Sequence, residues 1–165
     1  MQVTNLLGSI VRDRTPAVIA ALGGLALMAG TPVQAKPQVI ELTQVACQFL
    51  ESENGVDHGF ETSEKADCEA INARNAEQRL EEAKTLVLEP GEYTFRVTNV
   101  DVPYTLGFWL RGDGILNRAT LPSVSGGGLE PGETHDYSVE LEPGEYVYSC
   151  PLNPTPDYKL VVRES

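Results

Sequence analysis

Few residues of this chain could carry out metal or thiol chemistry, and the most prominent is a cysteine near the C-terminus. Cys150 lies in the stretch EYVYSCPLNPTPDYKLVV, residues 145–162, which contains no histidine. A cysteine thiolate is a soft metal ligand and a nucleophile, and both roles need a thiol with a lowered pKa. No Lys, Arg or His adjoins Cys150 in the sequence. The alternative is that Cys150 packs in the core as a small apolar side chain.

The two histidines of the chain are His58 and His135. His135 has the strand parity of Tyr137, so it could approach Cys150 and form a Cys and His pair with nucleophilic or metal-ligating character. His58 lies in the acidic segment VDHGFE, where it could share a divalent ion with Asp57 and a glutamate, although the spacing fits no calcium-binding loop. The alternatives are a hydrogen-bonded histidine at a strand end and a solvated loop.

The first 35 residues are predicted to be an export signal. Two arginines precede an apolar run that ends near Ala29, and Val33-Gln34-Ala35 supplies the small residues after which a signal peptidase cleaves. The run is well short of the ~20 residues that span a bilayer, which disfavours the alternative of a membrane anchor. We therefore expect residues 36–165 to form a single soluble domain, with no membrane span, in the periplasm or outside the cell.

Cleavage at this position would leave 10 basic and 23 acidic side chains, a formal charge of −13. A surface this acidic repels nucleic acid and anionic lipid, and it favours basic or cationic partners. The sequence contains no phosphate-binding loop, GxSxG, HExxH or paired-cysteine metal motif. We therefore expect neither nucleic-acid binding nor enzymatic activity.

The three cysteines Cys47, Cys68 and Cys150 permit three intramolecular pairings, and each pairing leaves one thiol free. Because Cys47 and Cys68 flank one polar segment with loop-like and helical character, we predict that they are bonded to each other. Closing a loop of this length stabilises a fold by about 3 kcal/mol in the chain-entropy model. Cys150 is then the free cysteine.

The elements that must position these residues are mostly strands. Residues 39–45, VIELTQV, alternate as a first strand would. The motif LEPGE occurs at 88–92, 129–133 and 141–145, and its Pro-Gly pair predicts a chain reversal at each copy, with glycine supplying a positive φ. Short alternating strands between such turns indicate a mainly β protein, an antiparallel Greek-key β-sandwich. The apolar faces of three strands would be Tyr93, Phe95 and Val97; Tyr137, Val139 and Leu141; and Tyr146, Tyr148 and Cys150.

Two segments depart from this strand pattern. Residues 60–84 are poor in β-branched residues, and Asn75 with Gln78 resembles a capping box, which predicts a helix over 76–84 within a short helical insertion. Residues 121–132, LPSVSGGGLEPG, are so rich in glycine that we expect a loop across an open end of the sandwich instead of a strand.

Three stretches carry a resemblance to a known family. They are VTNVDVPYTLGFWL (97–110), PGETHDYSVELEPGEYVYSC (131–150) and YKLVV (158–162). In this order and spacing they resemble the cupredoxins, the small blue-copper sandwich family that includes plastocyanin and pseudoazurin. The resemblance implies a cupredoxin-like β-sandwich in which one cysteine, two histidines and a methionine hold copper.

Only one of the four implied copper ligands is present. Cys150 matches the cysteine. Tyr104 and Asn153 take the two histidine positions, and Tyr158 takes the methionine position. An amide and a phenol with a pKa near 10 do not replace two imidazoles. We therefore expect a scaffold with no cofactor and no type 1 copper centre. The alternative is a copper-binding or electron-transfer protein that uses Cys150 in an atypical site, for instance with His135.

In the resembled family, the end of the sandwich near the metal is also the apolar surface by which partners dock. The corresponding residues of this chain are mainly aromatic residues and prolines, whose rigidity lowers the entropy lost on binding: Tyr104, Trp109, Cys150, Asn153, Pro154 and Tyr158. The sequence thus predicts an exported binding or accessory domain, not an enzyme. Its partner would be an unidentified protein or small molecule of the cell envelope. A thiol-based redox role for Cys150 is the remaining hypothesis.

Overall fold

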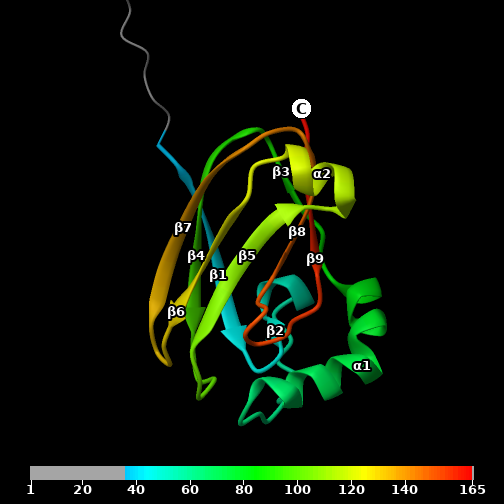
Figure 1. Ribbon diagram of the computed structural model, residues 1–165, viewed down its shortest axis with the longest axis vertical. Coiled ribbons are helices and arrows are strands. Elements are labelled where there is room, and N and C mark those ends of the chain that lie inside the picture. The colour runs from blue at the N-terminus through cyan, green and yellow to red at the C-terminus, as the bar shows by residue number, and fades with distance from the viewer. Residues whose placement is uncertain (1–35, 165) are drawn as a thin grey trace, which may run out of the picture. The chain divides into compact units, whose positions relative to one another are not determined.

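The computed structural model describes residues 36–164, which form two β-sheets packed on each other with two α-helices outside them (Figure 1). The predicted export signal lies outside the described residues. The strands are β1 (Gln38–Val45), β2 (Gln48–Phe49), β3 (Leu86–Leu88), β4 (Gly91–Asn99), β5 (Leu106–Gly112), β6 (Val124–Leu129), β7 (Thr134–Leu141), β8 (Gly144–Ser149) and β9 (Tyr158–Val162), and the helices are the 3-10 helix η1 (Glu51–Glu53), α1 (Lys65–Glu82) and α2 (Gly114–Thr120). The sheets have the orders β2-β1-β4-β7 and β3-β9-β8-β5-β6.

The predicted two-residue periodicity is confirmed, because the expected faces lie between the sheets. The buried members are Tyr93, Phe95, Val97, Tyr137, Leu141, Tyr146, Tyr148 and Cys150, and Val139 packs against them. The predicted β-sandwich is therefore confirmed. It is not purely antiparallel, since β1 pairs with β4 and β3 pairs with β9 in parallel. Parallel neighbours need long connections, and the segment that contains α1 supplies one between β1 and β4.

The three LEPGE copies lie between strands, as predicted, and each carries the chain from one sheet to the other. They join β3 to β4, β6 to β7, and β7 to β8. Gly91 and Gly132 have φ values of 149° and 81°, which favour glycine. Gly144 has no positive φ, and a Cβ there would lie 2.6 Å from Cδ1 of Leu121, so that side chain would have to shift for any larger residue.

The prediction that residues 121–132 form no strand is wrong. The strand β6 lies within this segment and pairs with β5 at the edge of its sheet. A Cβ on Gly107 would lie 2.4 Å from the carbonyl oxygen of Gly126, and a Cβ on Gly126 would lie 2.8 Å from Cε1 of Tyr137. The glycines therefore permit close backbone approach, which is one of the recognised roles of glycine within a strand.

The helical insertion holds one continuous helix, and its start differs from the prediction. α1 begins at Lys65, and its capping box is formed by Glu64 and Asp67 instead of by Asn75 and its partner. The Asp67 carboxylate accepts hydrogen bonds from the backbone N–H groups of Ser63 (2.8 Å) and Glu64 (3.1 Å). These bonds lower the pKa of Asp67. An acidic cap satisfies free N–H groups as well as the predicted amide cap would, so the helix starts at the earlier signal.

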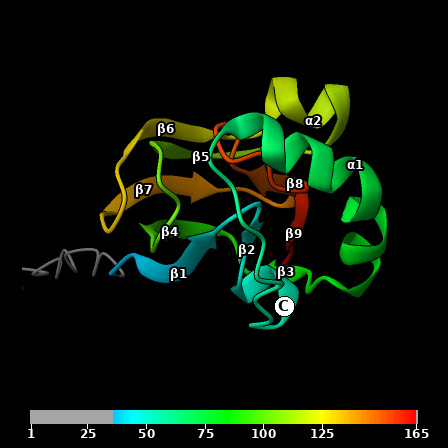
Figure 2. The ribbon, with the colours of Figure 1, turned by 90° about the horizontal axis from the view of Figure 1, so that it is seen from below.

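α1 is joined to the sandwich by covalent and polar contacts instead of by an apolar stripe. It buries only Cys68 and Arg79, and Figure 2 shows it beside β8 and β9. The predicted disulfide between Cys47 and Cys68 is confirmed, with a Cα to Cα distance of 5.1 Å. No helix among residues 36–164 has both the length and the apolar character needed to cross a bilayer.

Candidate functional site

Cys150 directly follows β8 and is buried, and it is the one free cysteine of the described residues. Its Sγ accepts hydrogen bonds from the N–H groups of Gly107 (3.4 Å) and Asn153 (3.2 Å). Burial raises the pKa of this thiol, and the hydrogen bonds oppose the effect only in part. The thiol is therefore protonated at neutral pH, as a packed core cysteine is.

Asn153 is fully buried and connects the loop after β8 to the segment that follows β1. Its Oδ1 accepts a hydrogen bond from the N–H of Cys47 (2.9 Å), and its Nδ2 donates one to the carbonyl oxygen of Val45 (2.9 Å). The same Oδ1 lies 3.1 Å from Sγ of Cys68, a disulfide sulfur that carries no proton. Both ends of the amide are thus engaged within the protein.

Tyr104 completes this end of the sandwich and is half-buried. Its hydroxyl lies 3.4 Å from Oδ1 of Asn153 and 3.7 Å from Sγ of Cys68. It also lies within 3.4 Å of Oγ1 of Thr62. Burial raises the pKa of Tyr104, so the phenol stays neutral. The structure therefore places Asn153 between the Tyr104 hydroxyl and the Cys150 thiol.

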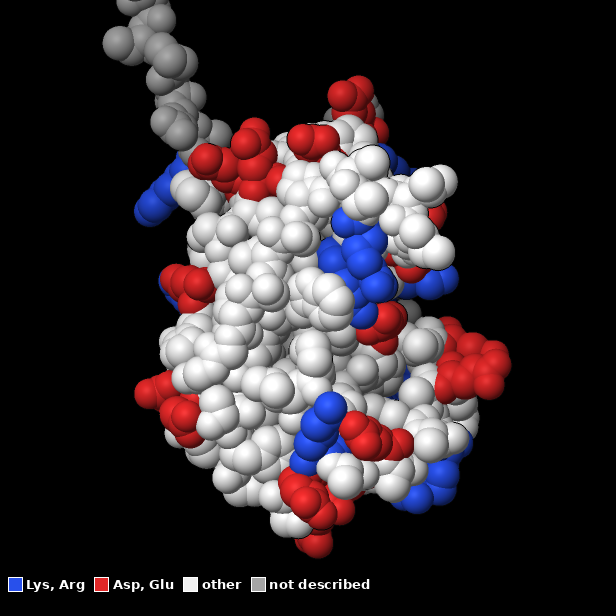
Figure 3. Space-filling view, viewed as in Figure 1, with Lys and Arg blue, Asp and Glu red and all other residues white. Residues whose placement is uncertain are grey.

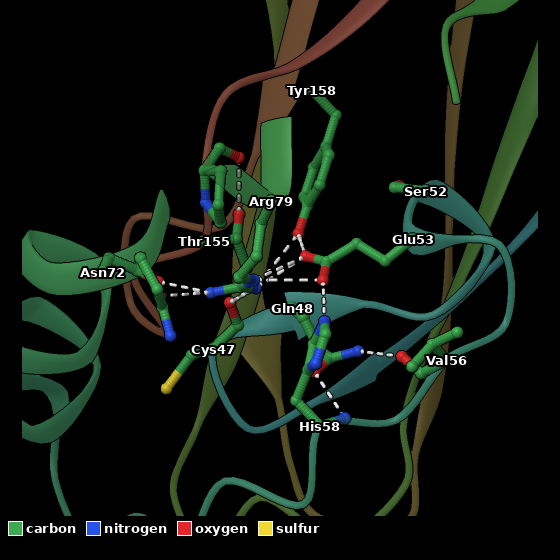
Figure 4. Close-up of polar contacts among 12 residues, drawn as sticks. Cys47, Gln48, Ser52, Glu53, Val56, His58, Asn72, Arg79, Thr155 and Tyr158 are labelled. Atoms are coloured by element: carbon green, nitrogen blue, oxygen red, sulfur yellow. Dashed lines mark hydrogen bonds and ion pairs between the residues drawn. The ribbon is translucent and has the colours of Figure 1, made fainter. Parts of the chain in front are cut away.

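Part of the predicted binding surface is buried and needs correction. Cys150, Asn153 and Tyr158 are each 0% exposed. The Tyr158 hydroxyl donates a hydrogen bond to Glu53 (Figure 4), and its ring lies 5.7 Å from that of Tyr148. Of the predicted surface at this end, Tyr104 and Pro154 remain accessible.

Two exposed apolar residues at this end were missed by sequence reasoning. Leu152 is 44% exposed and Val100 is 50% exposed. Both lie in loops that also contain predicted site residues. The sequence around each of them does not distinguish an exposed apolar residue from a buried one. Val100 and Tyr104 lie in the loop after β4, and Leu152 and Pro154 lie in the loop after β8; we call these four residues the loop surface.

Trp109 lies on the outer face of β5, away from the Cys150 thiol. Its ring is covered by the guanidinium groups of Arg111 and Arg118, whose Cζ atoms lie 4.1 and 5.6 Å from the ring centroid. Arg111 is held in turn by Asp157, to which it donates two hydrogen bonds of 2.7 Å. The alternation of β5 explains the placement, because Phe108 points into the core and Trp109 points out.

His135 does not form the predicted pair with Cys150. Its Nε2 lies 3.4 Å from the carboxylate of Glu133, and its ring faces Tyr137 at a centroid distance of 6.5 Å. The side chain is 37% exposed. No hydrogen bond among residues 36–164 joins it to Cys150, which agrees with the alternative of a histidine at a strand end.

A second buried polar centre surrounds an ion pair between Glu53 and Arg79 (Figure 4). Nη2 of Arg79 lies 2.6 Å from Oε1 of Glu53, and the two side chains are 6% and 4% exposed. Arg79 also donates hydrogen bonds to the carbonyl oxygen of Cys47 (3.0 Å) and to Oδ1 of Asn72 (2.8 Å). Sequence reasoning missed this centre, since nothing near Arg79 distinguishes it from an exposed helix residue.

Glu53 remains ionised although it is buried. Burial alone would raise its pKa, but hydrogen bonds from Arg79, Tyr158 and His58, with the charge of Arg79, hold the pKa below its ordinary value. Nε2 of His58 lies 2.6 Å from Oε2 of Glu53, so His58 faces Glu53 and not the neighbouring Asp57. Burial and the nearby carboxylate of Glu53 raise the pKa of Tyr158.

Comparison with known proteins finds similar solved structures only at low sequence identity. No protein-family model matches the chain, and no curated protein matches it. Similar solved structures include auracyanin B, with 14% identity and a TM-score of 0.49 over 80% of this chain and 94% of that chain. Another is auracyanin A, a blue copper protein from Chloroflexus aurantiacus, with 16% identity and a TM-score of 0.43 over 78% of this chain and 100% of that chain. A multi-copper oxidase from Pediococcus acidilactici matches at 8% identity and a TM-score of 0.42, over 93% of this chain and 31% of that chain.

The fold is a β-sandwich of two sheets with two α-helices outside them. At these identities and TM-scores, no ligand, activity or partner carries over from those proteins to this chain. Its own residues must decide whether the metal that the sequence resemblance implies would fit.

The residues present do not fit a type 1 copper centre. Among residues 36–164, no group of three or more His, Cys, Asp or Glu side chains is placed to hold a metal ion. At the Cys150 end the Asn153 amide is engaged by the backbone of Cys47 and Val45, and neither an amide nor a phenol supplies the nitrogen ligands of a type 1 centre. Oε1 of Gln44 is buried without a hydrogen-bond partner, but one neutral oxygen does not supply the missing imidazoles.

Proposed function

We propose that this chain is an exported cupredoxin-like binding or accessory domain that works without a type 1 copper centre and catalyses no reaction. The engagement of Asn153 is the observation that carries the proposal. Its amide fills a ligand position of the class and bonds to Cys47 and Val45 at 2.9 Å each. A ligand would have to break both bonds before it could use this side chain. The disulfide supports export, since such bonds persist in oxidising compartments.

The loop surface is the proposed contact region. The loop that carries Tyr104 is held in shape by Asn99, whose Oδ1 accepts a hydrogen bond from the N–H of Val102 (3.0 Å) and whose Nδ2 donates to the carbonyl of Tyr104 (3.3 Å). Loops fixed in this way lose little entropy when they bind. The acidic charge of the chain favours a basic or cationic partner, a protein or small molecule of the cell envelope.

Addition of one equivalent of Cu(II) to purified residues 36–165 tests the copper part of the proposal. We expect no intense visible thiolate-to-copper absorption, and no copper in the protein after desalting. An intense absorption that disappears in Cys150→Ser would contradict the proposal. It would favour the alternative, a copper-binding or electron-transfer protein with an atypical site.

Substitution on the loop surface tests the binding part. We expect Leu152→Asp to reduce the capture of envelope proteins by immobilised residues 36–165 at least about tenfold, because a carboxylate replaces an apolar contact. Val87→Asp is the matched control, since Val87 is 50% exposed on β3. Equal capture by both variants would place the contact region elsewhere.

A further inference from the structure

The helix α2 presents the most exposed apolar side chains in the described part of the molecule. Ile115 is 89% exposed and Leu116 is 81% exposed, and no residue of α2 is buried. α2 follows β5, whose first residues lie near Cys150, so it is at the other end of that strand. Figure 2 shows α2 standing out from the sheet that contains β5 and β8. Adjacent aliphatic side chains with so little contact indicate an interaction site.

The base of this projection combines an aromatic ring with an unpaired cation. Trp109 lies next to α2, and Arg118, on the last turn of α2, covers its ring at 5.6 Å. Arg111 lies on the same ring, but its charge is matched by Asp157. Arg118 is exposed and has no ion pair among residues 36–164, so its charge is available to a ligand.

α2 and the segment that follows it carry little charge of their own although the chain is strongly acidic. Between residues 114 and 129, Arg118 is the one charged side chain, while Asp113 and Glu145 lie at the start of α2. Figure 3 shows basic side chains beside a broad uncharged area on this face, while the acidic side chains lie mostly toward its margins. A surface that bears two exposed aliphatic side chains beside one unpaired cation complements an apolar phase bordered by phosphate groups.

We propose that α2 is a peripheral contact with a phospholipid bilayer. Ile115 and Leu116 insert at the boundary between head groups and acyl chains, Trp109 lies at the interface, and Arg118 extends its guanidinium to lipid phosphates. Lipid is favoured over a protein partner, because two adjacent aliphatic side chains that are 89% and 81% exposed can enter a soft phase without a preformed pocket. This contact is separate from the loop surface and does not depend on the proposed function.

The charge of the chain sets the lipid preference. Asp113 precedes α2 and is exposed, and the whole chain is acidic, so anionic lipid is repelled while zwitterionic lipid still offers its phosphate to Arg118. Two aliphatic side chains give weak and reversible binding, no stronger than that of a single acyl chain. We therefore expect binding to phosphatidylcholine vesicles that weakens when phosphatidylglycerol is added.

Trp109 is the only tryptophan of the chain and so reports on this contact directly. Residues 36–165 are titrated with phosphatidylcholine vesicles while tryptophan emission and vesicle flotation are measured. We expect a blue shift of the emission and a floating fraction that rises with lipid. The double variant Ile115→Ser/Leu116→Ser should lower the partition coefficient at least about tenfold. Arg118→Glu should lower it by a smaller factor, and Arg118→Lys should retain it.

Val87→Ser is the matched control, because Val87 is an exposed apolar residue outside this patch, and it should leave partition unchanged. Absence of both blue shift and flotation at millimolar lipid would overturn the proposal. Equal partition by the double variant and the wild type would also overturn it. A dimer that forms without lipid, is detected by sedimentation and is lost in the double variant would also overturn the proposal. In that case a second copy of the chain would cover α2.

Discussion

The two buried polar centres of this protein share one residue and differ in charge. Cys47 donates its N–H to Asn153 in the neutral centre, and its carbonyl oxygen accepts a hydrogen bond from Arg79 in the ionic centre. It adopts a left-handed conformation with a φ of 63°, which is uncommon for a residue other than glycine. The two centres therefore hold one strained turn from both sides, and the disulfide of Cys47 adds a third attachment.

The two centres also differ in the parts of the chain that they join. The neutral centre lies where the sequence resemblance implies metal ligands, and there Asn153 makes hydrogen bonds within the protein. The ionic centre belongs to the helical insertion, and its partners saturate Glu53 and Arg79. This ion pair joins α1 to η1, and Arg79 also bonds to the carbonyl oxygen of Cys47.

Loss of the cation should be the most damaging change. Arg79→Met leaves Glu53 buried without its main partner, so we expect the free energy of unfolding to fall by about 3–5 kcal/mol. Arg96→Met is the control, because the pair of Arg96 with Asp136 is exposed, and it should cost less than about 1 kcal/mol. Urea-induced unfolding measures both. Similar losses of unfolding free energy in the two variants would show that the buried ion pair stabilises the fold no more than the exposed one does.

Removal of the covalent attachment should have the next largest effect. Cys47→Ser/Cys68→Ser opens a loop with a sequence separation of 21 residues, and we expect a loss of about 3 kcal/mol. Thermal unfolding of the double variant gives the measurement. Cys150→Ser keeps the disulfide and serves as the control. A loss confined to Cys150→Ser would mean that the thiol, not the bridge, stabilises this end.

Truncation of Asn153 in the neutral centre should reduce the free energy of unfolding by less than either change above. Asn153→Ala leaves the N–H of Cys47 and the carbonyl of Val45 unpaired in a buried place, and we expect a cost of about 2 kcal/mol by urea unfolding. Asn75→Ala is a suitable control, because Asn75 makes only a long hydrogen bond of 3.4 Å to Arg79. A cost near zero for Asn153→Ala would show that the amide can be spared, and would weaken the argument against a ligand there.

The sequence predicted the parts of the fold that depend on local pattern. The strand faces and the reversal at each LEPGE copy follow from alternation and turn chemistry. The Cys47 to Cys68 bridge was predicted from the segment that the two cysteines flank, and it is present. The burial of Asn153 could not be predicted, because it depends on contacts more than 100 residues apart in the chain.

The missed features share this dependence on tertiary contacts. Glycines in β6 are unfavourable by propensity, and only the ring of Tyr137 and the backbone of β5 show why they are needed. Arg79 is one of several charged residues on α1, and only the position of Glu53 in η1 makes it buried. Propensity describes a residue by its neighbours in sequence, and these residues are determined by their neighbours in space.

The stabilising contributions of the two centres should depend on pH with opposite signs. The pKa of Glu53 is lowered in the folded state, so its stabilisation is present above the unfolded pKa of about 4.3 and is lost as the pH falls through the folded pKa. The pKa of Cys150 is raised, so its stabilisation is present below about pH 8.5 and is lost as the pH rises through the folded pKa.

Urea unfolding from pH 3 to 9.5 separates these contributions through the slopes of stability against pH. Glu53→Gln should reduce the acid slope without abolishing it, because the lowered pKa values of Asp67 and Asp136 also contribute. Cys150→Ala should flatten the alkaline slope, since the raised pKa of about 12 for Tyr148 lies beyond this range. Parallel curves for the wild type and Glu53→Gln would mean that the acid response arises at the surface, and the ionic centre would then be no more sensitive to pH than the neutral one.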